Sequence, residues 1–270
     1  MQNEIRYIDL FGGIGGFRLG IKKSGLKANC VFYSDIDKFA VQIYNKNFNE
    51  NHKPTDIRKI RAEEIPEFDM LCGGFPCQAF SLAGKRRGFE DTRGTLFFEI
   101  ARIAKSKRPK IIWLENVKGL LSHKKGKTFG CIIQTLAELG YDCQWMVLNS
   151  KFFGVPQSRQ RVFIIATLPG KCSRKVFFDQ ENSKEMAARM QKEEQASFYC
   201  LTTGSPTNSP HETTIIKDGK RFRVITPLEA ERLQGFPDNW TQGVSDTQRY
   251  KQLGNAVTVN VIKAIAERIF

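Results

Sequence analysis

Ile5-Arg6-Tyr7-Ile8-Asp9-Leu10-Phe11-Gly12-Gly13-Ile14-Gly15-Gly16, which occupies residues 5–16, decides the fold of this chain. The first half is apolar enough for a buried strand, and the second half is a glycine-rich loop that leads into a helical pattern at 15–24. Nucleotide-type cofactors bind at such a junction of strand, loop and helix. The opening segment therefore predicts an α/β fold with a cofactor loop after its first strand.

Strand-like and helical patterns alternate as far as residue 167. The runs, in order, are 5–10, 15–24, 30–34, 36–48, 68–72, 96–104, 111–114, 128–139, 143–148 and 162–167. This alternation predicts a doubly wound, mostly parallel sheet of the Rossmann-like kind. The last two runs have no helix between them, so we expect them to pair antiparallel and to place one antiparallel strand at an edge of the sheet.

After Thr167 the sequence loses this alternation. It becomes mixed in charge and then rich in turn-forming residues at 202–210, which excludes a long helix there. A helix is predicted to begin at Thr226-Pro227, with the threonine as its N-cap, and another to run from about 257 to the C-terminus. The predicted domains are a large one, 1–167 plus 256–270, and a small, irregular, β-rich one, 168–255.

The chain is long enough, at 270 residues, to bury a full core, and it is strongly basic. Lys and Arg number 42 against 28 Asp and Glu, a net charge of +14, and much of the excess lies at 85–87, 105–110 and 118–127. Such clusters suit nucleic acid, although a solvated basic face explains the charge alone equally well. The N-terminus has no signal-peptide pattern and no segment is long enough to span a bilayer, so we expect a soluble, cytoplasmic protein that does not contact membranes.

The seven cysteines and three histidines show no metal-binding or disulfide spacing. There is no Cys-x-x-Cys pair, and the histidines are scattered. The pattern argues against both a zinc cluster and a disulfide framework, so no metal is expected.

Cys77 stands at the end of the run Leu71-Cys72-Gly73-Gly74-Phe75-Pro76-Cys77-Gln78, where an apolar strand gives way to a polar loop. Ligands bind at this edge of open α/β sheets, so a thiol beyond the two glycines is placed to act as a nucleophile. Cys72, inside the strand, is expected to be buried and inert, which is the usual fate of a free thiol.

The glycine loop does not spell Gly-x-Gly-x-x-Gly from either Gly13 or Gly15, so it does not indicate a pyrophosphate-binding loop. Asp9 precedes the glycines and is placed to neutralise an amino group. Asp35 follows the second strand, where an acid binds ribose hydroxyls, and Asp56 is placed to accept a hydrogen bond from an adenine amine. These residues favour a cofactor that combines an ammonium group with a ribose.

Glu115 ends the apolar run 111–114, and we expect it at the same edge of the sheet as Cys77. A carboxyl there is partly desolvated, which raises its pKa and lets it share a proton near neutral pH. Capping of the following turn is the structural alternative. Arg159 and Arg161 point the same way on a β-run, and their guanidinium groups suit a phosphate, a base carbonyl or a surface ion pair.

Together these segments resemble the DNA (cytosine-5) methyltransferase family over nearly the whole chain except about 168–195. The matching motifs are 9–16, Gly74-Phe75-Pro76-Cys77-Gln78, Glu115-Asn116-Val117, Gln157-x-Arg159-x-Arg161, Arg232-Leu233-Gln234-Gly235-Phe236-Pro237 and Gly254-Asn255-Ala256-Val257. Any one of them occurs by chance, but the whole series in the family's order is highly specific.

The resemblance implies that the protein methylates C5 of a cytosine flipped out of a specific duplex DNA sequence. Cys77 would attack C6 as a thiolate and make C5 nucleophilic, while Glu115 binds N3 and the exocyclic amine. Arg161, supported by Arg159, would steady the base carbonyl. The implied methyl donor is S-adenosylmethionine, which becomes S-adenosylhomocysteine, and no metal takes part. Because C6 is inaccessible in a stacked duplex, the base has to leave the helix.

The cofactor contacts implied by the family and by the glycine loop are Asp9, Phe11, Gly13, Gly15, Asp35, Ile36, Asp56, Pro76, Leu96 and Asn255. Ile36 is a departure, because many relatives carry a tryptophan beside the ribose-binding acid. An isoleucine still packs on adenine, but we expect weaker cofactor affinity.

The expected DNA contacts fall in a closing loop at 78–94 and in a variable region at 168–223 that is short for the family. They are Gln78, Ser81, Lys85, Arg86, Arg87, Thr202, Thr203, Arg221 and Arg223. The recognition sequence is not readable from these residues. We expect a monomer acting on double-stranded DNA, with a cognate restriction endonuclease as a functional rather than a physical partner.

Two other functions stay open at this point. A related enzyme would methylate cytosine-5 in tRNA, although that branch tends to carry threonine where Ser81 stands here. A non-catalytic DNA-binding relative is the second, although every catalytic position of the family is intact in this chain.

Overall fold

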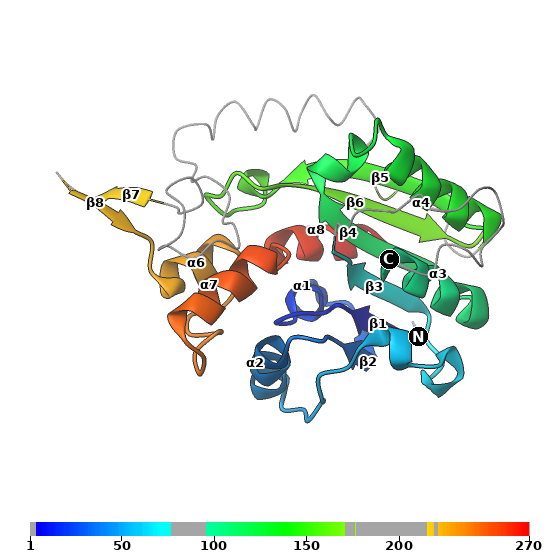
Figure 1. The fold of residues 1–270 in the computed structure, drawn as a ribbon, viewed down its shortest axis with the longest axis horizontal. Coiled ribbons are helices and arrows are strands. Elements are labelled where there is room, and N and C mark those ends of the chain that lie inside the picture. The colour runs from blue at the N-terminus through cyan, green and yellow to red at the C-terminus, as the bar shows by residue number, and fades with distance from the viewer. Residues whose placement is uncertain (1–3, 77–95, 171–175, 177–214, 219–220, 270) are drawn as a thin grey trace.

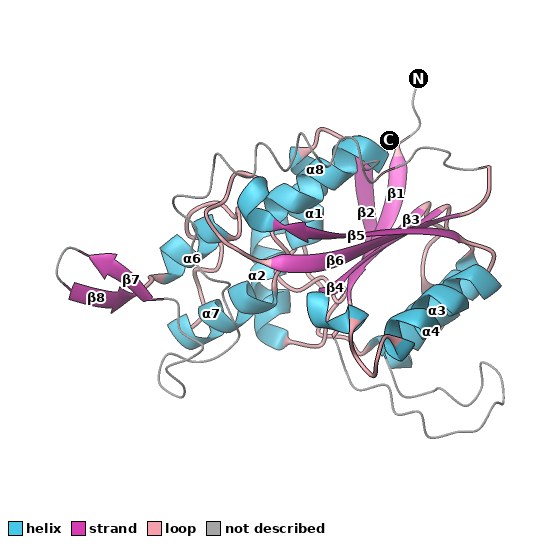
Figure 2. Cartoon of the chain, turned by 90° about the horizontal axis from the view of Figure 1, so that it is seen from above, coloured by secondary structure: helices cyan, strands magenta, loops and turns pink. Residues whose placement is uncertain are grey.

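Six strands form one sheet in the computed structural model, and helices cover both of its faces (Figure 1). The structure describes residues 4–76, 96–170, 176, 215–218 and 221–269. Seen from above, α1 and α8 lie on one side of the sheet and α3 and α4 on the other (Figure 2). The predicted α/β, doubly wound architecture is confirmed.

The sheet has the strand order β2-β1-β3-β4-β6-β5. Its strands are β1 (Ile5–Leu10), β2 (Ala28–Ser34), β3 (Met70–Gly74), β4 (Ile111–Val117), β5 (Asp142–Asn149) and β6 (Gln160–Thr167). The pairs β1–β2, β1–β3 and β3–β4 are parallel, whereas β6 runs antiparallel to both β4 and β5. The predicted antiparallel pairing of the last two strands is confirmed.

The antiparallel strand lies inside the sheet rather than at its edge, where the sequence placed it. β6 inserts between β4 and β5, and β5 becomes the edge strand. Burial gives the reason, because the last six residues of β6 are buried but only the last two of β5 are. The more apolar strand takes the position that is covered on both sides.

Each run predicted between 5 and 167 corresponds to an observed element, with ends that differ by at most three residues. The helices of this part are α1 (Gly16–Lys23), α2 (Lys38–Phe48), α3 (Leu96–Lys107) and α4 (Lys127–Glu138), and short 3-10 turns lie at Ile57–Lys59, Ala62–Glu64, Lys118–Leu121 and Ser150–Phe152. Two predicted ends were wrong in a way that matters. β3 continues through Gly73 and Gly74, and β4 continues through Glu115 to Val117. Glu115 is therefore held within the sheet, not on a turn.

Two apolar clusters, one on each face, stabilise the sheet. One packs α3 and α4 against the sheet through residues such as Ile100 and Leu136, and the other packs α1 and α8 (Val259–Ile269) through residues such as Phe17 and Ile262. Burial of a Leu, Ile or Phe side chain contributes about 1.5–3 kcal/mol, so these faces fix the strands whose ends form the site described below.

The described part of 168–255 consists of a hairpin and two helices. The hairpin pairs β7 (Ile215–Asp218) with β8 (Arg221–Val224) and extends from α6 away from the sheet (Figures 1 and 2). The predicted N-cap is confirmed, since Thr226 and Glu229 form a capping box at the start of α6 (Pro227–Leu233). No pattern in the sequence indicated α7 (Asp246–Asn255).

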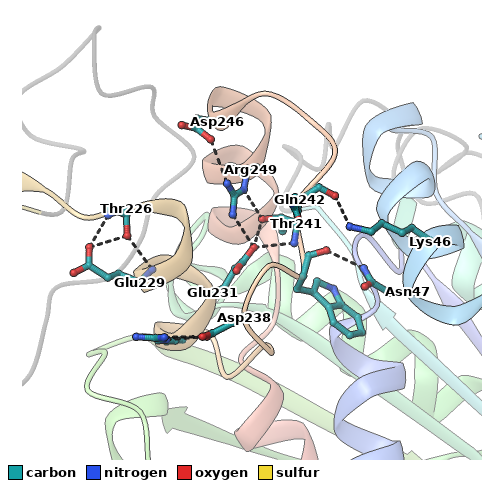
Figure 3. Close-up of polar contacts among 12 residues, drawn as sticks. Lys46, Asn47, Thr226, Glu229, Glu231, Asp238, Thr241, Gln242, Asp246 and Arg249 are labelled. Carbon is teal, nitrogen blue, oxygen red and sulfur yellow. Dashed lines mark hydrogen bonds and ion pairs between the residues drawn. The ribbon is translucent and has the colours of Figure 1, made fainter.

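Side chains from α2 hold the loop between α6 and α7, as Figure 3 shows. Lys46 Nζ donates to the Gln242 carbonyl oxygen at 2.7 Å, and Asn47 Nδ2 donates to the Trp240 carbonyl oxygen at 2.9 Å. Glu231, fully buried in α6, accepts from the Thr241 backbone N–H at 2.8 Å and pairs with Arg249 of α7. These contacts join α6 and α7 to each other and join the loop between them to α2.

Candidate active site

A cavity of about 770 Å³ opens at the carboxyl ends of β1, β2, β3 and β4. Its walls include the glycine loop, the residues after β2 and β3, the end of β4 and the turn after α7. The predicted site residues that line it are Phe11, Gly13, Asp35, Ile36, Asp56, Pro76, Leu96, Glu115, Arg159, Arg161 and Asn255. The structure thus brings together residues from both the cofactor set and the catalytic set.

The glycine loop lies very close to the wall behind it. Gly13 N donates to Asp35 Oδ2 and the Tyr33 hydroxyl donates to the Gly13 carbonyl oxygen, both at 2.8 Å. A Cβ on Gly12 would come within 2.8 Å of the Asp9 carboxyl and 2.7 Å of the Tyr33 ring. Phe11 has a φ of 55°, a left-handed conformation that is uncommon for a residue with a side chain. The backbone of this loop is therefore fixed in place.

Asp9 and Gly15, both predicted as cofactor contacts, do not line the cavity. Asp9 is fully buried beneath Gly12, and its oxygens have no hydrogen-bond partner among the described residues. Burial raises the pKa of Asp9 to about 7, the Arg18 guanidinium lowers it and the Asp35 carboxylate raises it. Gly15 is the N-cap of α1, and a Cβ there would overlap the Phe48 ring.

Three residues shape the end of the cavity that follows β2. Asp35 accepts from Gly13 N and, through Oδ1, from Asp37 N at 2.8 Å. Burial raises the pKa of Asp35, and these backbone N–H groups counteract the rise. Ile36 is 66% exposed and presents an apolar surface at the cavity. Asp56 pairs with Arg58 at 2.6 Å, which holds the pKa of that carboxyl below its usual range.

Glu115 faces the opposite end of the cavity. It is paired with Gly74 in the sheet, and its side chain is nearly buried. Arg161 Nε lies 3.1 Å from Glu115 Oε1. Burial raises the pKa of Glu115, while the charges of Arg161 and Arg159 oppose the rise. A carboxyl with a raised pKa in a cavity is suited to hold or share a proton near neutral pH.

Arg159 has a different environment from Arg161. It is only 2% exposed, and its Nη2 donates to the carbonyl oxygens of Gly254 at 2.7 Å and Ala256 at 3.0 Å. Asn255, between those two residues, lines the cavity. The guanidinium group thus holds the C-terminal end of α7 against the part of the site that contains Glu115. The sequence did not indicate this role.

The described structure stops just before the predicted nucleophile. Asn116 Nδ2 donates to the Phe75 carbonyl oxygen at 2.8 Å, which fixes the backbone immediately before Pro76. The predicted residues Cys77, Gln78, Ser81, Lys85, Arg86, Arg87, Thr202 and Thr203 lie outside the described residues, as does the side chain of Arg221.

Arg223, predicted to bind DNA, makes a bidentate ion pair with Glu229. Its Nη1 and Nη2 atoms lie 2.8 and 2.7 Å from the two carboxylate oxygens. Hydrogen bonds from Arg223 lower the pKa of Glu229 to about 2. Because Glu229 also completes the capping box with Thr226, Arg223 anchors β8 to the start of α6 (Figure 3 shows the capping box).

Several residues that position the site were missed from the sequence. Trp240 Nε1 donates to the Ile14 carbonyl oxygen at 3.0 Å, and Lys251 Nζ lies 2.9 Å from Asp37 Oδ2. The first contact ties the segment from α6 to α7 to the glycine loop, and the second ties it to the start of α2. Gln252, Gly254 and Val257 also line the cavity. Only the motif at 254–257 carried a signal, because the other contacts join residues far apart in the sequence.

Two classes of feature are absent from the described parts of the chain. No group of histidine, cysteine, aspartate or glutamate side chains there has the arrangement of a metal site. None of the described helices has the length and apolar character needed to cross a membrane.

Comparison with known proteins identifies the family. A family model described as "C-5 cytosine-specific DNA methylase" matches residues 5–197 and 167–270. Type II methyltransferase M1.ScrFI of Lactococcus lactis subsp. cremoris is 42% identical over 305 aligned positions, which cover 98% of this chain and 78% of that protein. Type II methyltransferase M.HhaI of Haemophilus parahaemolyticus is 36% identical, and the alignment covers 98% of this chain and 94% of that protein.

The fold is shared with a more distant protein of known structure. The S. pombe Dnmt2 methyltransferase superposes with a TM-score of 0.75 at 22% identity, and the alignment covers 97% of each chain. At this level of identity the likeness concerns the fold alone.

Proposed function

The chain belongs to the C-5 cytosine-specific DNA methylase family and is a DNA (cytosine-5) methyltransferase, and we propose that it acts on a cytosine flipped out of a specific duplex sequence, using Cys77 as nucleophile and S-adenosylmethionine as methyl donor. In this proposal residues 1–167 plus 256–270 form the catalytic domain and 168–255 the target-recognition domain.

The observation that carries the proposal is the Glu115–Arg161 pair at the cavity. Glu115 is held within β4 and is paired with Gly74 of β3. Cys77 follows Gly74 by three residues in the sequence. A base placed in the cavity would meet a carboxyl that can hold a proton and a guanidinium group that can donate to a carbonyl. Cytosine presents an N3 atom, an exocyclic amine and a carbonyl along one edge, which matches this pair.

Each residue type corresponds to a step of the chemistry. The Cys77 thiolate forms a bond to C6, the π pair of C5–C6 shifts to C4–C5, and the π pair of C4–N3 shifts to N3, where Glu115 supplies a proton. C5 is then nucleophilic enough to accept a methyl group. The C5 proton is then lost to water, its bonding pair re-forms the C5–C6 double bond, and the Cys77 sulfur leaves as a thiolate. N3 returns its proton to Glu115, which restores the aromatic ring and the starting state of the carboxyl. Arg161 holds the carbonyl of the base throughout.

The cavity fits the methyl donor that the family implies. The space of about 770 Å³ has the size of a cofactor site, Gly12 and Gly13 allow close approach, and Ile36 offers an apolar surface to a flat ring. Asp35 and Asp56 would bind the ribose hydroxyls and the adenine amine. When bound, S-adenosylmethionine supplies an electrophilic methyl group on a sulfonium centre.

Asp9 would act on this cofactor from a distance, because it lies beneath the loop and not in the lining. Phe11, Gly13, Pro76, Leu96 and Asn255 remain the proposed wall contacts, and Gly15 serves the packing of α1 instead.

The proposed DNA contacts lie mostly outside the described residues. They remain Gln78, Ser81, Lys85, Arg86 and Arg87 of the closing loop, with Thr202, Thr203 and Arg221 of the recognition region. Arg223 would support Arg221 through its anchor on Glu229 rather than contact DNA itself. A restriction endonuclease with the same target is the expected functional partner, since the relatives are Type II methyltransferases.

Bisulfite sequencing of duplex DNA treated with the protein and S-adenosylmethionine tests the proposal, because it reports the base, the position and the target together. Protection of one cytosine in a recurring sequence is expected, and its loss in Cys77→Ala. Methyl incorporation into tRNA alone would instead identify an RNA methyltransferase. Duplex binding without any methyl transfer would identify a non-catalytic relative.

A further inference from the structure

A lysine-rich loop leaves the rim of the cavity directly after β4. Val117 lines the cavity and pairs in register with Arg161 of β6. Lys118 follows it, and its Nζ donates to Gln160 Oε1 at 2.8 Å. From there a 3-10 turn, Lys118–Leu121, leads into the segment that begins α4 at Lys127. The loop 118–127 is thus attached at the point where Glu115 and Arg161 meet.

The charge of this loop has one sign. Lys118, Lys124, Lys125 and Lys127 are all exposed. The sequence contains no acidic residue between 116 and 137. A run of four exposed lysines presents a positive surface beside the cavity, and such a surface attracts phosphate groups.

The backbone of the loop is held in an unusual conformation. Lys124 and Lys125 have φ values of 50° and 57°, and Gly126 follows with 82°. Each left-handed residue with a side chain costs roughly 1–2 kcal/mol, so the surroundings have to maintain it. They do so through hydrogen bonds from Lys125 N to Ser122 and from Gly126 N to His123, and through a 2.7 Å contact between His123 Nδ1 and Thr128 Oγ1. The backbone that carries these lysines is therefore held in a defined conformation.

The other end of β4 provides a contrast. The second basic cluster, 105–110, precedes Ile111, where the strand begins. There Lys107 pairs with Glu67 at 2.6 Å and Lys110 pairs with Asp69 at 2.7 Å. A strand of this length spans about 20 Å, so the two clusters lie at opposite edges of the sheet. The lysines of the 105–110 cluster thus have acidic partners at the far end of β4, whereas the loop 118–127 begins at the rim of the cavity.

We propose that Lys118, Lys124, Lys125 and Lys127 bind the phosphates of the duplex that flank the target cytosine. The inference rests on the proposed function, because it takes the cavity to receive a base from DNA. A base that enters the cavity brings its strand to the rim. Duplex DNA carries one negative charge per roughly 1.7 Å of its axis, so several phosphates would lie within reach of a loop of this size.

The test compares two variants that each lose three positive charges. In the first, Lys124, Lys125 and Lys127 are changed to glutamine, which leaves Lys118 and its contact with Gln160 intact. In the control, Lys105, Lys107 and Lys110 are changed to glutamine. The equilibrium binding of a fluorescent duplex is measured by anisotropy over a series of salt concentrations, with thermal unfolding to compare the folded state of each protein.

The loop variant should reduce the slope of log K against log salt by about 2 to 3, since each lost phosphate contact removes roughly 0.9. At low salt its duplex affinity should fall by at least about tenfold, because the lost contacts supply mainly the electrostatic part of binding. The control should keep the wild-type slope. A third protein with arginine at 124, 125 and 127 should restore the slope, which a role in folding alone would not predict.

An unchanged slope in a folded loop variant would overturn the inference, and so would equal losses in the loop variant and the control. Binding and methylation are separate readouts. If the wild type methylates DNA but the loop variant keeps its slope, this inference fails and the proposed function stands. If the wild type binds duplex through the loop but never transfers a methyl group, the proposed function fails instead.

Discussion

The two ends of the cavity hold their carboxylates, Asp35 and Glu115, in different ways. At the end that follows β2, Asp35 is held by two backbone N–H groups, which are fixed dipoles. At the end of β4, Glu115 is held by the side chain of Arg161. Burial raises the pKa of both carboxyls, and only the counteracting groups differ. Fixed backbone donors suit a carboxylate that stays charged and binds a ligand, whereas a side-chain partner suits a carboxyl that exchanges a proton.

The largest expected effect comes from removing the proton exchange at the β4 end. Glu115→Gln keeps the shape but not the acid, so kcat for methyl transfer should fall by about 10² to 10⁴. The dissociation constant for S-adenosylmethionine, measured by calorimetry, should stay within about threefold because the other end is untouched. Glu138→Gln, the same change on the exposed surface of α4, serves as the control. If Glu115→Gln lowered cofactor affinity as well as kcat, the two ends of the cavity would not have separate roles.

The next prediction concerns Asp9, a carboxyl beneath the glycine loop that has no hydrogen-bond donor among the described residues. With a pKa raised from 3.8 to about 7, it binds its proton more tightly in the folded state than in the unfolded state. Its contribution to stability is therefore present below about pH 4 and is lost as the pH rises through 7, at an upper limit of roughly 4 kcal/mol. Asp9→Asn should be the more stable protein at pH 8, and the difference should shrink towards pH 4. Parallel urea-unfolding profiles for the two proteins across this range would contradict the account.

Arg159 holds the end of α7, which also lines the cavity, so its loss should affect cofactor binding. In Arg159→Ala the buried Gly254 carbonyl and the part-buried Ala256 carbonyl lose a charged donor, which should lower the free energy of unfolding by about 3 kcal/mol. The end of α7 that carries Asn255 loses its support, and the dissociation constant for the cofactor should rise by about tenfold or more. Arg161→Ala should mainly lower kcat. If both arginine variants show the same pattern of kcat and cofactor binding, the assignment of different roles is wrong.

The smallest expected effect concerns the apolar surface at the end of the cavity that follows β2. Ile36 is 66% exposed, so a larger ring fits at this position without disturbing the core. Ile36→Trp should tighten cofactor binding by about threefold to tenfold, in line with about 0.5–1.5 kcal/mol for an aromatic pair. Ile36→Ala should weaken it. Equal affinity in all three proteins would show that the cofactor does not pack on this side chain.

Local patterns explain what the sequence predicted well. β1 was predicted with its observed ends, and the N-cap at Thr226 was correct, because both depend on neighbouring residues. The motif residues that line the cavity were also found, since each lies in or close to a segment where a strand or helix begins or ends. Contacts between distant segments were not predictable. Trp240 reaches Ile14 and Arg159 reaches Gly254 only in the folded chain, and the position of β6 inside the sheet depends on burial against both neighbours.

The central claim is that Cys77 forms a bond to the target base, and a duplex with 5-fluorocytosine at the methylated position tests it most directly. Fluorine at C5 cannot leave as a proton does, so the Cys77 sulfur cannot depart after methylation. Incubation with S-adenosylmethionine should give a stable complex of protein and DNA, joined through Cys77 in peptide mass spectrometry and absent in Cys77→Ala. The contradicting result is the absence of any adduct in wild-type protein that methylates the unfluorinated duplex under the same conditions.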